Sequence, residues 1–402
     1  MPEHDDLYKA ETYLRTFCNV KPNRRTGSKG NREASSFFAR TIQSFGYQID
    51  TTAFESLDYF CRQVALKYDD RSFEVFISPY SLGCDALAEL VCISTIQELE
   101  TKDFRGKLLL LSGDICAEQL MPKNFTFYNP DEHQKIISLL EDNKPVGIIT
   151  ATGKNPELVG ALSPYPLIYD GDFDVPSVYC KKSVGETLAV LEGQTLHLLI
   201  DSVRIPSTSH NIVAKLVREG NQKILFTAHL DAYEDSPGAL DNAAGITVLL
   251  LLAEKLASYR GPYSIEFVAI NGEDHYSAGG EKDYIKRYQS EFPDIKLAVN
   301  IDDIGYKKGD SAYSFYECDQ GLEAVVVETM GNFKGISRGE PWFNGDHMVF
   351  LQNGVPAIAL TSALITDVMR DITHTAQDTP DKIDFHKLVE VAEALTRLVQ
   401  NL

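Results

Sequence analysis

Hydrophobic and polar positions divide the chain into three stretches. Apolar residues recur at helical spacing over residues 7–17 and 32–45, and the second of these predicted helices ends at Gly46. From about Leu57 the pattern changes to short apolar runs of strand length with few helices between them. After Pro206, strand-length runs alternate with helical segments up to the C-terminus. The pattern therefore predicts one domain built from both ends of the chain and a second domain inserted into it.

The stretch after Pro206 is typical of an α/β fold, with a mixed, mostly parallel sheet covered by helices on both faces. Its expected strands are 212–216, 224–229, 265–270, 297–301 and 357–360, and its expected helices are 242–258, 279–288, 321–330 and 385–402. In the middle stretch we expect strands at 63–68, 73–76, 87–92, 107–111, 146–150, 175–180 and 195–200, and helices at 133–141 and 183–191. The expected domains are 1–57 with 206–402, and a small β-rich module at 58–205.

Histidines and acidic residues stand at or just after the ends of these strands, or at a helix start. In chain order they are His229, Asp231, Asp241, Glu273, Asp274, Asp302 and His374. Ligands and metals collect at the carboxyl ends of strands in open α/β sheets. Taken singly, each residue is more often a surface pair, a helix cap or a solvated loop residue. The repeated combination of apolar run and acid instead favours one shared metal site.

Each of these residue types has a physical role in such a site. Imidazole and carboxylate together suit Zn²⁺, at distances of about 2.0–2.2 Å. Two metal ions about 3.5–4 Å apart need anionic ligands between them, and Asp241 is expected to bridge them. We expect His229 and Asp302 to complete one metal site, and Asp274 and His374 to complete the other.

Two further residues are expected to support the metals. Asp231 stands two positions after His229, where it can accept the proton of the second ring nitrogen and fix the tautomer. Glu273 points away from its neighbour Asp274 if the strand continues that far. That orientation would leave Glu273 free to act as a general base on a metal-bound water.

These motifs resemble those of the co-catalytic zinc aminopeptidases, a family that includes bacterial leucyl aminopeptidases, glutamate carboxypeptidase II and transferrin receptor. The matching segments are 25–31, 229–231, 238–245, 271–274, 300–302, 345–347 and His374 with 378–379. The family commonly has Glu-Glu where this chain has Glu273-Asp274, and Ser where it has Gly345. Neither difference removes a type of metal ligand.

The resemblance implies a two-zinc exopeptidase, foremost an aminopeptidase that removes N-terminal residues from peptides, with Glu273 as the general base on a metal-bridging water. Co²⁺ or Mn²⁺ are alternative metals. In the resembling family the segment after Trp342 lies near the substrate site, so we expect Trp342 to line the pocket, with an ordinary core or surface aromatic as the alternative. We expect Asp346 and His347 to brace the pocket rather than to bind metal. The inserted stretch resembles a protease-associated domain in its segments 106–111, 145–149 and 175–178. An unrelated linker domain is the alternative for that stretch.

Other functions remain open on the same scaffold. The first is a different amide hydrolase, such as a dipeptidase, a carboxypeptidase or a deacylase. The second is a binding protein that has lost catalysis, against which the complete set of ligands and Glu273 counts. The third is a glutaminyl cyclase, which uses one zinc on a similar scaffold and is disfavoured by the two-metal set.

Length, charge and cysteine content bear on the number of domains, the partners and the cellular compartment of this protein. The chain has 402 residues, enough for two domains, and a formal charge of −20, which argues against binding to nucleic acid or to anionic membranes. The acidic N-terminus lacks the order of a signal peptide, and no apolar run is long enough to span a membrane. Seven cysteines without a Cys-x-x-Cys motif are typical of reduced thiols. We therefore expect a cytoplasmic enzyme with a peptide substrate; the oligomeric state is not predicted.

Overall fold

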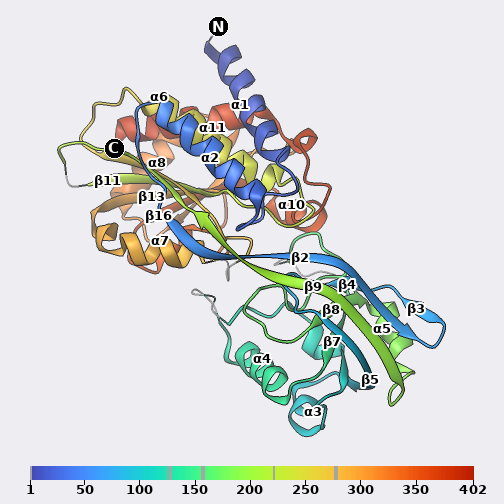
Figure 1. Ribbon diagram of the computed structural model, residues 1–402. Helices are drawn as coiled ribbons and strands as arrows, with labels where there is room; N and C mark the ends of the chain where they lie inside the picture. Colours follow the sequence, from blue (N-terminus) through green and yellow to red (C-terminus); the bar gives the residue numbers. More distant parts are fainter. Residues whose placement is uncertain (1, 124, 126–128, 155–158, 221, 276–278) are drawn as a thin grey trace. The chain divides into compact units, whose positions relative to one another are not determined.

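The computed structural model describes residues 2–123, 125, 129–154, 159–220, 222–275 and 279–402 (Figure 1). Its described residues divide into two compact units. Unit 1 comprises Met1–Ser56, Thr208–Asp274 and Gly279–Leu402, and unit 2 comprises Leu57–Ser207 with His275. Within the described residues, no helix is both long enough and apolar enough to cross a membrane.

Unit 1 contains an eight-stranded mixed sheet of order β1-β10-β12-β11-β13-β16-β14-β15. Its strands are β1 (Gln48–Asp50), β10 (Ile212–Leu216), β11 (Lys223–His229), β12 (Ser264–Ile270), β13 (Ile295–Ile301), β14 (Ser311–Tyr316), β15 (Ile336–Arg338) and β16 (Ala357–Ser362). The central strands β12, β11, β13 and β16 are parallel, and β10 and β14 flank them antiparallel. The carboxyl ends of the central strands therefore share one edge of the sheet.

Helices cover both faces of this sheet, as expected for the predicted α/β class, which the structure confirms. Figure 1 shows α2, α6 and α11 on one face and α7 on the other. The helical elements are α1 (Pro2–Cys18), α2 (Lys29–Ser44), η3 (Ala239–Ala244), α6 (Gly245–Leu256), α7 (Gly280–Tyr288), η5 (Gln289–Asp294), α8 (Gln320–Met330), α9 (His347–Leu351), α10 (Ile365–Asp371), η6 (Pro380–Lys382) and α11 (Phe385–Asn401). Every residue of β11 is buried, which explains why its sequence is mostly apolar and does not alternate between apolar and polar residues.

Unit 2 has its own eight-stranded sheet, of order β3-β2-β9-β5-β6-β7-β8-β4, in which β5, β6, β7 and β8 are parallel. The strands are β2 (Ala53–Tyr68), β3 (Arg71–Phe73), β4 (Phe76–Ile77), β5 (Cys84–Ile93), β6 (Leu108–Leu111), β7 (Gly147–Thr152), β8 (Ser177–Lys181) and β9 (Thr195–His210). The helical elements are α3 (Ile96–Thr101), η1 (Gly113–Cys116), α4 (Asp131–Asn143) and α5 (Lys182–Ala189). The strand predicted at 73–76 is wrong: its two ends belong to β3 and β4, which pair with different strands.

Candidate metal centre

His229 is the last residue of β11, at the edge where the central strands end. Its ring is buried, and its Nε2 atom lies 2.9 Å from Oδ1 of Asp241 and 3.4 Å from Oδ1 of Asp302. Asp302 directly follows β13, the strand beside β11. The neighbouring parallel strands β11 and β13 thus bring His229 and Asp302 together, and Asp241 reaches the same place from η3.

His374 forms a second group of the same composition. Its Nε2 atom lies 3.1 Å from Oδ2 of Asp241 and 3.1 Å from Oδ1 of Asp274. The ring of Tyr233 stacks on the His374 imidazole, with ring centroids 4.8 Å apart and planes inclined by 15°. Asp241 therefore turns one carboxylate oxygen to each of the two histidines.

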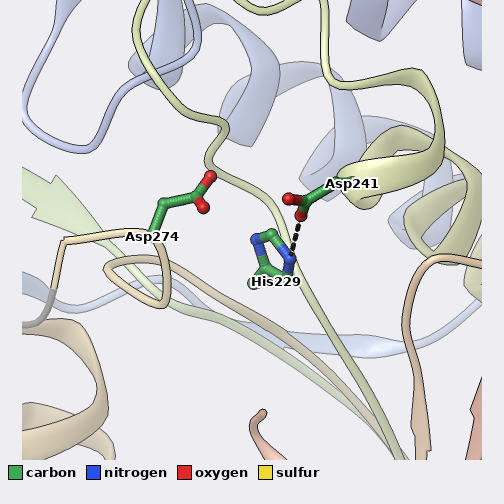
Figure 2. A group of neighbouring side chains, drawn as sticks. All are labelled: His229, Asp241 and Asp274. Carbon is green, nitrogen blue, oxygen red and sulfur yellow. Dashed lines mark ion pairs between the residues drawn. The ribbon is translucent and has the colours of Figure 1, made fainter. Parts of the chain in front are cut away.

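The side chains of His229, Asp241 and Asp274 are buried and point toward one another in Figure 2. One donor atom from each lies within 4.8 Å of the other two. The donors are an imidazole nitrogen and carboxylate oxygens, the chemistry that Zn²⁺ accepts in proteins. The residues present therefore fit a zinc ion.

Asn242 connects Asp241 to the end of β13. Its side-chain amide donates to the carbonyl of Ile301 at 2.9 Å, and its side-chain oxygen accepts the N–H of Gly245 at 2.9 Å. Asp241 itself has non-helical backbone angles within η3, and the peptide bond that follows it is cis. The two hydrogen bonds of Asn242 fix the neighbouring Asp241 next to Asp302, the residue that follows Ile301.

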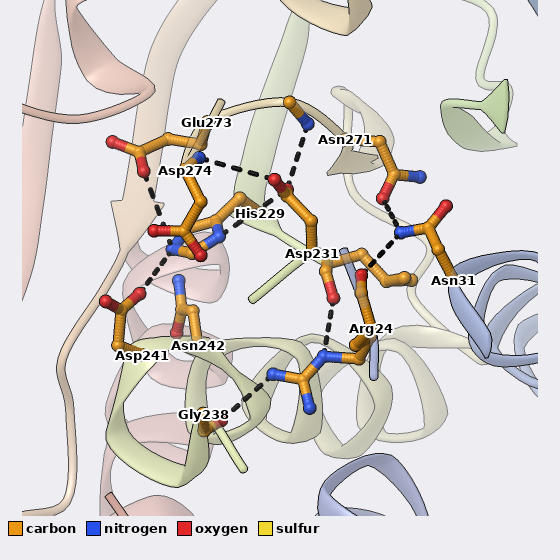
Figure 3. Close-up of polar contacts among 12 residues, drawn as sticks. Arg24, Asn31, His229, Asp231, Gly238, Asp241, Asn242, Asn271, Glu273 and Asp274 are labelled. Atoms are coloured by element: carbon orange, nitrogen blue, oxygen red, sulfur yellow. Dashed lines mark hydrogen bonds and ion pairs between the residues drawn. The ribbon is translucent and has the colours of Figure 1, made fainter. Parts of the chain in front are cut away.

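The carboxylate of Asp231 holds the segment that carries Glu273 and Asp274 (Figure 3). It accepts the N–H of Gly272 at 2.9 Å and the N–H of Asp274 at 3.3 Å. The Nδ1 atom of His229 lies 3.7 Å from Oδ1 of Asp231, which is longer than a hydrogen bond. In this structure the direct hydrogen bonds of Asp231 thus order the backbone around Glu273.

Glu273 does not lie on a strand, so the premise that the strand continues is wrong. β12 ends at Ile270, and Gly272 has φ of +96°, a left-handed conformation that favours glycine. This turn and the amide hydrogen bonds to Asp231, rather than strand alternation, separate the directions of Glu273 and Asp274. The Oε2 atom of Glu273 lies 4.0 Å from Nε2 of His229.

Two acids of this centre, Asp274 and Glu273, are hard to ionise without a cation, whereas hydrogen bonds from His229 and His374 outweigh burial and lower the pKa of Asp241. Burial, followed by the charge of Asp241, raises the pKa of Asp274 to about 6. Burial also raises the pKa of Glu273 well above its usual range, with Asp302 and Asp274 adding to the effect. Burial lowers the pKa of His229, but the surrounding carboxylates more than offset this effect and raise it well above its ordinary value. A bound divalent cation would relieve the repulsion among the carboxylates.

Trp342, Asp346 and His347 lie together in a neighbouring group. His347 is buried, its Nε2 atom is 2.9 Å from the carbonyl of Trp342, and burial lowers its pKa to about 4. Burial, followed by the charge of Glu281, raises the pKa of Asp346 well above its usual range. A Cβ atom at Gly345 would come within 2.7 Å of the Trp342 ring. The indole therefore occupies space that a serine at this position would need.

Comparison with known proteins places this centre in a family. The sequence profile of peptidase family M28 matches residues 211–399, the segment that contains all five predicted metal ligands. The match, here called the M28 segment, covers a little under half of the chain. The predicted resemblance to zinc aminopeptidases and the predicted class of peptidase are therefore confirmed.

Relatives of the M28 segment include curated aminopeptidases. Aminopeptidase YwaD of Bacillus subtilis is 25% identical over 242 residues, which cover 56% of this chain and 51% of the relative. Leucine aminopeptidase 2 of Trichophyton rubrum is 23% identical over 381 residues, covering 88% of this chain and 71% of the relative. The chain thus spans about half the length of the Bacillus protein.

Solved structures share the fold over nearly the whole chain. The aminopeptidase from Aneurinibacillus sp. strain AM-1 has a TM-score of 0.76 at 22% identity, with 98% of this chain and 93% of that chain covered. BSAP, a zinc aminopeptidase from Bacillus subtilis, has a TM-score of 0.74 at 19% identity, with 98% and 94% covered. At these identities the likeness shows the fold alone.

Several residues that the strand pattern did not indicate also contact the candidate ligands or hold the backbone around them. Asn242 and Tyr233 contact the candidate metal ligands, and Asn271 donates to the carbonyl of His210 and accepts from Asn31. Arg24 and Asp378 hold the backbone between His229 and Asp241. The segments 25–31 and 378–379 contain or adjoin several of these residues, so the family motif was the available signal.

Proposed function

We propose that the chain is a two-zinc aminopeptidase that removes N-terminal residues from peptides. The observation that carries this proposal is the position of Asp241, whose two oxygens face two different histidines at 2.9 and 3.1 Å. A carboxylate in this position suits a bridge between two cations. Asp302 lies beside the first histidine and Asp274 beside the second, which supports one further acid for each metal. The relatives named as aminopeptidases support the substrate class, and BSAP supports zinc.

Glu273 supplies the proton transfer in this proposal. Zinc bound at the centre polarises a peptide carbonyl and makes water more acidic. The carboxylate of Glu273 takes the proton from the attacking water and delivers it to the nitrogen of the leaving amine. Its backbone is held on Asp231 through the flanking amides, so the carboxylate reaches the reacting water in a fixed orientation. Its burial and raised pKa bring its basicity closer to neutral pH.

Metal analysis and paired substrates test this function. The purified protein should contain about two zinc ions per chain, with Co²⁺ or Mn²⁺ able to replace them. It should hydrolyse aminoacyl anilides with a free α-amino group and leave their N-acetylated forms intact. Preference for the acetylated forms would indicate a deacylase. Cleavage from the carboxyl end would indicate a carboxypeptidase, and metal binding without hydrolysis would indicate a binding protein.

Trp342 is proposed as a wall of the substrate pocket. Its ring contacts the neutral His347 at a centroid distance of 4.6 Å, and His347 in turn lies 3.4 Å from the side-chain nitrogen of Asn300, two residues before Asp302. An indole can hold an apolar side chain on its face. Trp342→Ala should therefore change the ranking of aminoacyl substrates while zinc content stays unchanged. An unchanged ranking would make Trp342 a packing residue only.

Unit 2 is proposed to be a protease-associated-like domain that favours short peptides. Strands β6, β7 and β8 coincide with the segments 106–111, 145–149 and 175–178 on which the resemblance rests. Hydrolysis rates should fall as the peptide is lengthened from two to about ten residues (about 33 Å when extended) and on to a folded protein with the same N-terminal residue. Equal rates across the series would contradict this role.

We also propose that the protein works in the cytoplasm. All seven cysteines are free thiols, and reducing compartments keep thiols in this state. Cell fractionation followed by detection of the protein tests the location, and recovery outside the cytoplasm would contradict it.

A further inference from the structure

The backbone between His229 and Asp241 is held by a buried arginine. Arg24 lies between α1 and α2 and is 3% exposed. Its guanidinium donates to the carbonyls of Leu230 at 2.7 Å, Pro237 at 3.0 Å and Gly238 at 2.9 Å. Figure 3 shows the contact between Arg24 and Gly238. One rigid fork of donors thus joins the residue after His229 to the residues just before η3.

The same guanidinium is itself fixed in place. It also donates to the carbonyl of Phe17 in α1 at 3.1 Å, so all of its acceptors are main-chain carbonyls. The backbone carbonyl of Arg24 accepts from the side-chain amide of Asn31 at 3.0 Å. Removing a cation from water is costly unless its donors are satisfied, and here four carbonyls satisfy them.

Asp378 holds the residues that follow the arginine contacts. The fully buried carboxylate of Asp378 accepts the N–H of Leu240 at 2.8 Å and the N–H of Asp241 at 3.1 Å. Its main-chain carbonyl accepts the N–H of Ala239 at 3.2 Å. Four consecutive residues, Gly238 to Asp241, therefore each make a hydrogen bond to Arg24 or Asp378.

We propose that Arg24 and Asp378 form a backbone clamp that positions Asp241 between the two histidines. The guanidinium takes the carbonyls of the connection and the carboxyl group takes the amides of Leu240 and Asp241, so the pair fixes the backbone of Asp241 without touching its carboxylate. Neither residue reaches the substrate or a metal; both act through Asp241. The inference rests on the proposed metal centre, because the clamp matters for function only if Asp241 binds metal. Contacts behind a metal ligand are typically worth about 10–100-fold in metal affinity.

Conservative variants test the clamp. Arg24→Lys keeps the charge and loses the planar fork, and Asp378→Asn keeps the shape and turns one acceptor into a donor. Each should weaken Zn²⁺ binding by about 10–100-fold, measured by competition with a chelator of known affinity. The visible absorption spectrum of the Co²⁺-loaded protein should change as well. The double variant should lose less than the product of the two single effects, because both residues hold the same segment.

Arg218→Lys is the matched control. Arg218 also lies in unit 1 and donates to the carbonyls of Val217 and Tyr259, at the opposite end of β12 from Asn271. This variant should keep the affinity for Zn²⁺ and the Co²⁺ spectrum of the wild type. Thermal unfolding of each metal-free variant separates general stability from metal binding.

The outcomes distinguish this inference from the proposed function. If Arg24→Lys and Asp378→Asn lower the unfolding temperature but leave Zn²⁺ affinity and the Co²⁺ spectrum unchanged, the clamp is overturned and the metal centre stands. Independent, multiplicative effects of the two substitutions would show that they do not hold one segment, and would also overturn it. If the wild-type protein binds no metal, the proposed function itself fails.

Discussion

Replacing Glu273 with glutamine is the most direct test of the proposed chemistry. The substitution keeps the length and shape of the side chain and removes its capacity to take a proton. The carboxylate lies 4.0 Å from the His229 ring, and its side chain is 13% exposed. It is not one of the three buried residues whose donor atoms lie within 4.8 Å of one another. We therefore expect Glu273→Gln to change the chemical step and to leave the metals in place.

The expected loss follows from the role of a general base. Such a base contributes about 10²–10⁴-fold to the rate. At about 1.4 kcal/mol for each factor of ten, the barrier should rise by about 3–5 kcal/mol. The Michaelis constant should change little, since the amide of glutamine fills the same space.

Steady-state kinetics on a free aminoacyl anilide and elemental analysis measure the two quantities. Glu281→Gln is the matched control, because Glu281 is also a buried glutamate and lies in α7, outside the three residues whose donor atoms cluster. This control should retain turnover to within about tenfold. Retained turnover in Glu273→Gln would place the base elsewhere, with Asp303 as the next candidate. Loss of zinc from Glu273→Gln would make this residue a ligand.

Three further predictions concern the bridge, the metal-free protein and the far end of the sheet. Asp241→Asn keeps one side-chain oxygen and loses the other. Elemental analysis should therefore find about one zinc ion or fewer per chain, and two zinc ions per chain would contradict the bridging role of Asp241. In the metal-free protein the raised pKa values of Asp274, about 6, and Asp378, about 7, favour the folded state at low pH. Because Asp in the unfolded chain titrates near about 3.9, this stabilisation of the metal-free protein is lost as pH rises from about 4 to 7. The difference in unfolding temperature between the zinc-loaded and the metal-free protein should therefore widen over that range, and a constant difference would contradict this prediction. Lys223→Met removes the partner that lies 2.8 Å from the buried Glu266 and leaves Lys215 at 3.8 Å, so urea denaturation should show a loss of about 3 kcal/mol, the lower end of the range for a broken buried pair. Activity per folded molecule should stay unchanged.

The sequence predicts the central sheet well because its strands are buried on both faces. β11, β12 and β13 contain mainly apolar residues over strand length, and their predicted bounds differ from the observed ones by no more than two residues. β14 was not predicted: its residues, Ser-Ala-Tyr-Ser-Phe-Tyr, alternate small or polar residues with aromatic ones and give no continuous run. The short helices α9 and α10 were also missed, because five and seven residues are too few to show a helical period.

Asp241 lies in η3 and His374 follows α10, so the family motif rather than a strand end indicated them. His229 and Asp302 were predictable for the same reason as the strands, since each stands at the end of a strand. The groups that hold the ligands were not, because their contacts join distant parts of the chain. Arg24 reaches Leu230 across 206 positions, and Asp378 reaches Leu240 across 138, with no local pattern at either end.

Glu273 shows how a residue can be selected on a mistaken geometric premise. Strand alternation predicts that Glu273 points away from Asp274, but the strand ends three residues earlier. What sets its direction is the turn at Gly272 together with two amides bound to Asp231. Asp231 is therefore tied to the proposed base by hydrogen bonds of 2.9 and 3.3 Å, and to the His229 ring only at 3.7 Å. It follows that Asp231 orders the backbone of the proposed base more directly than it contacts the His229 ring.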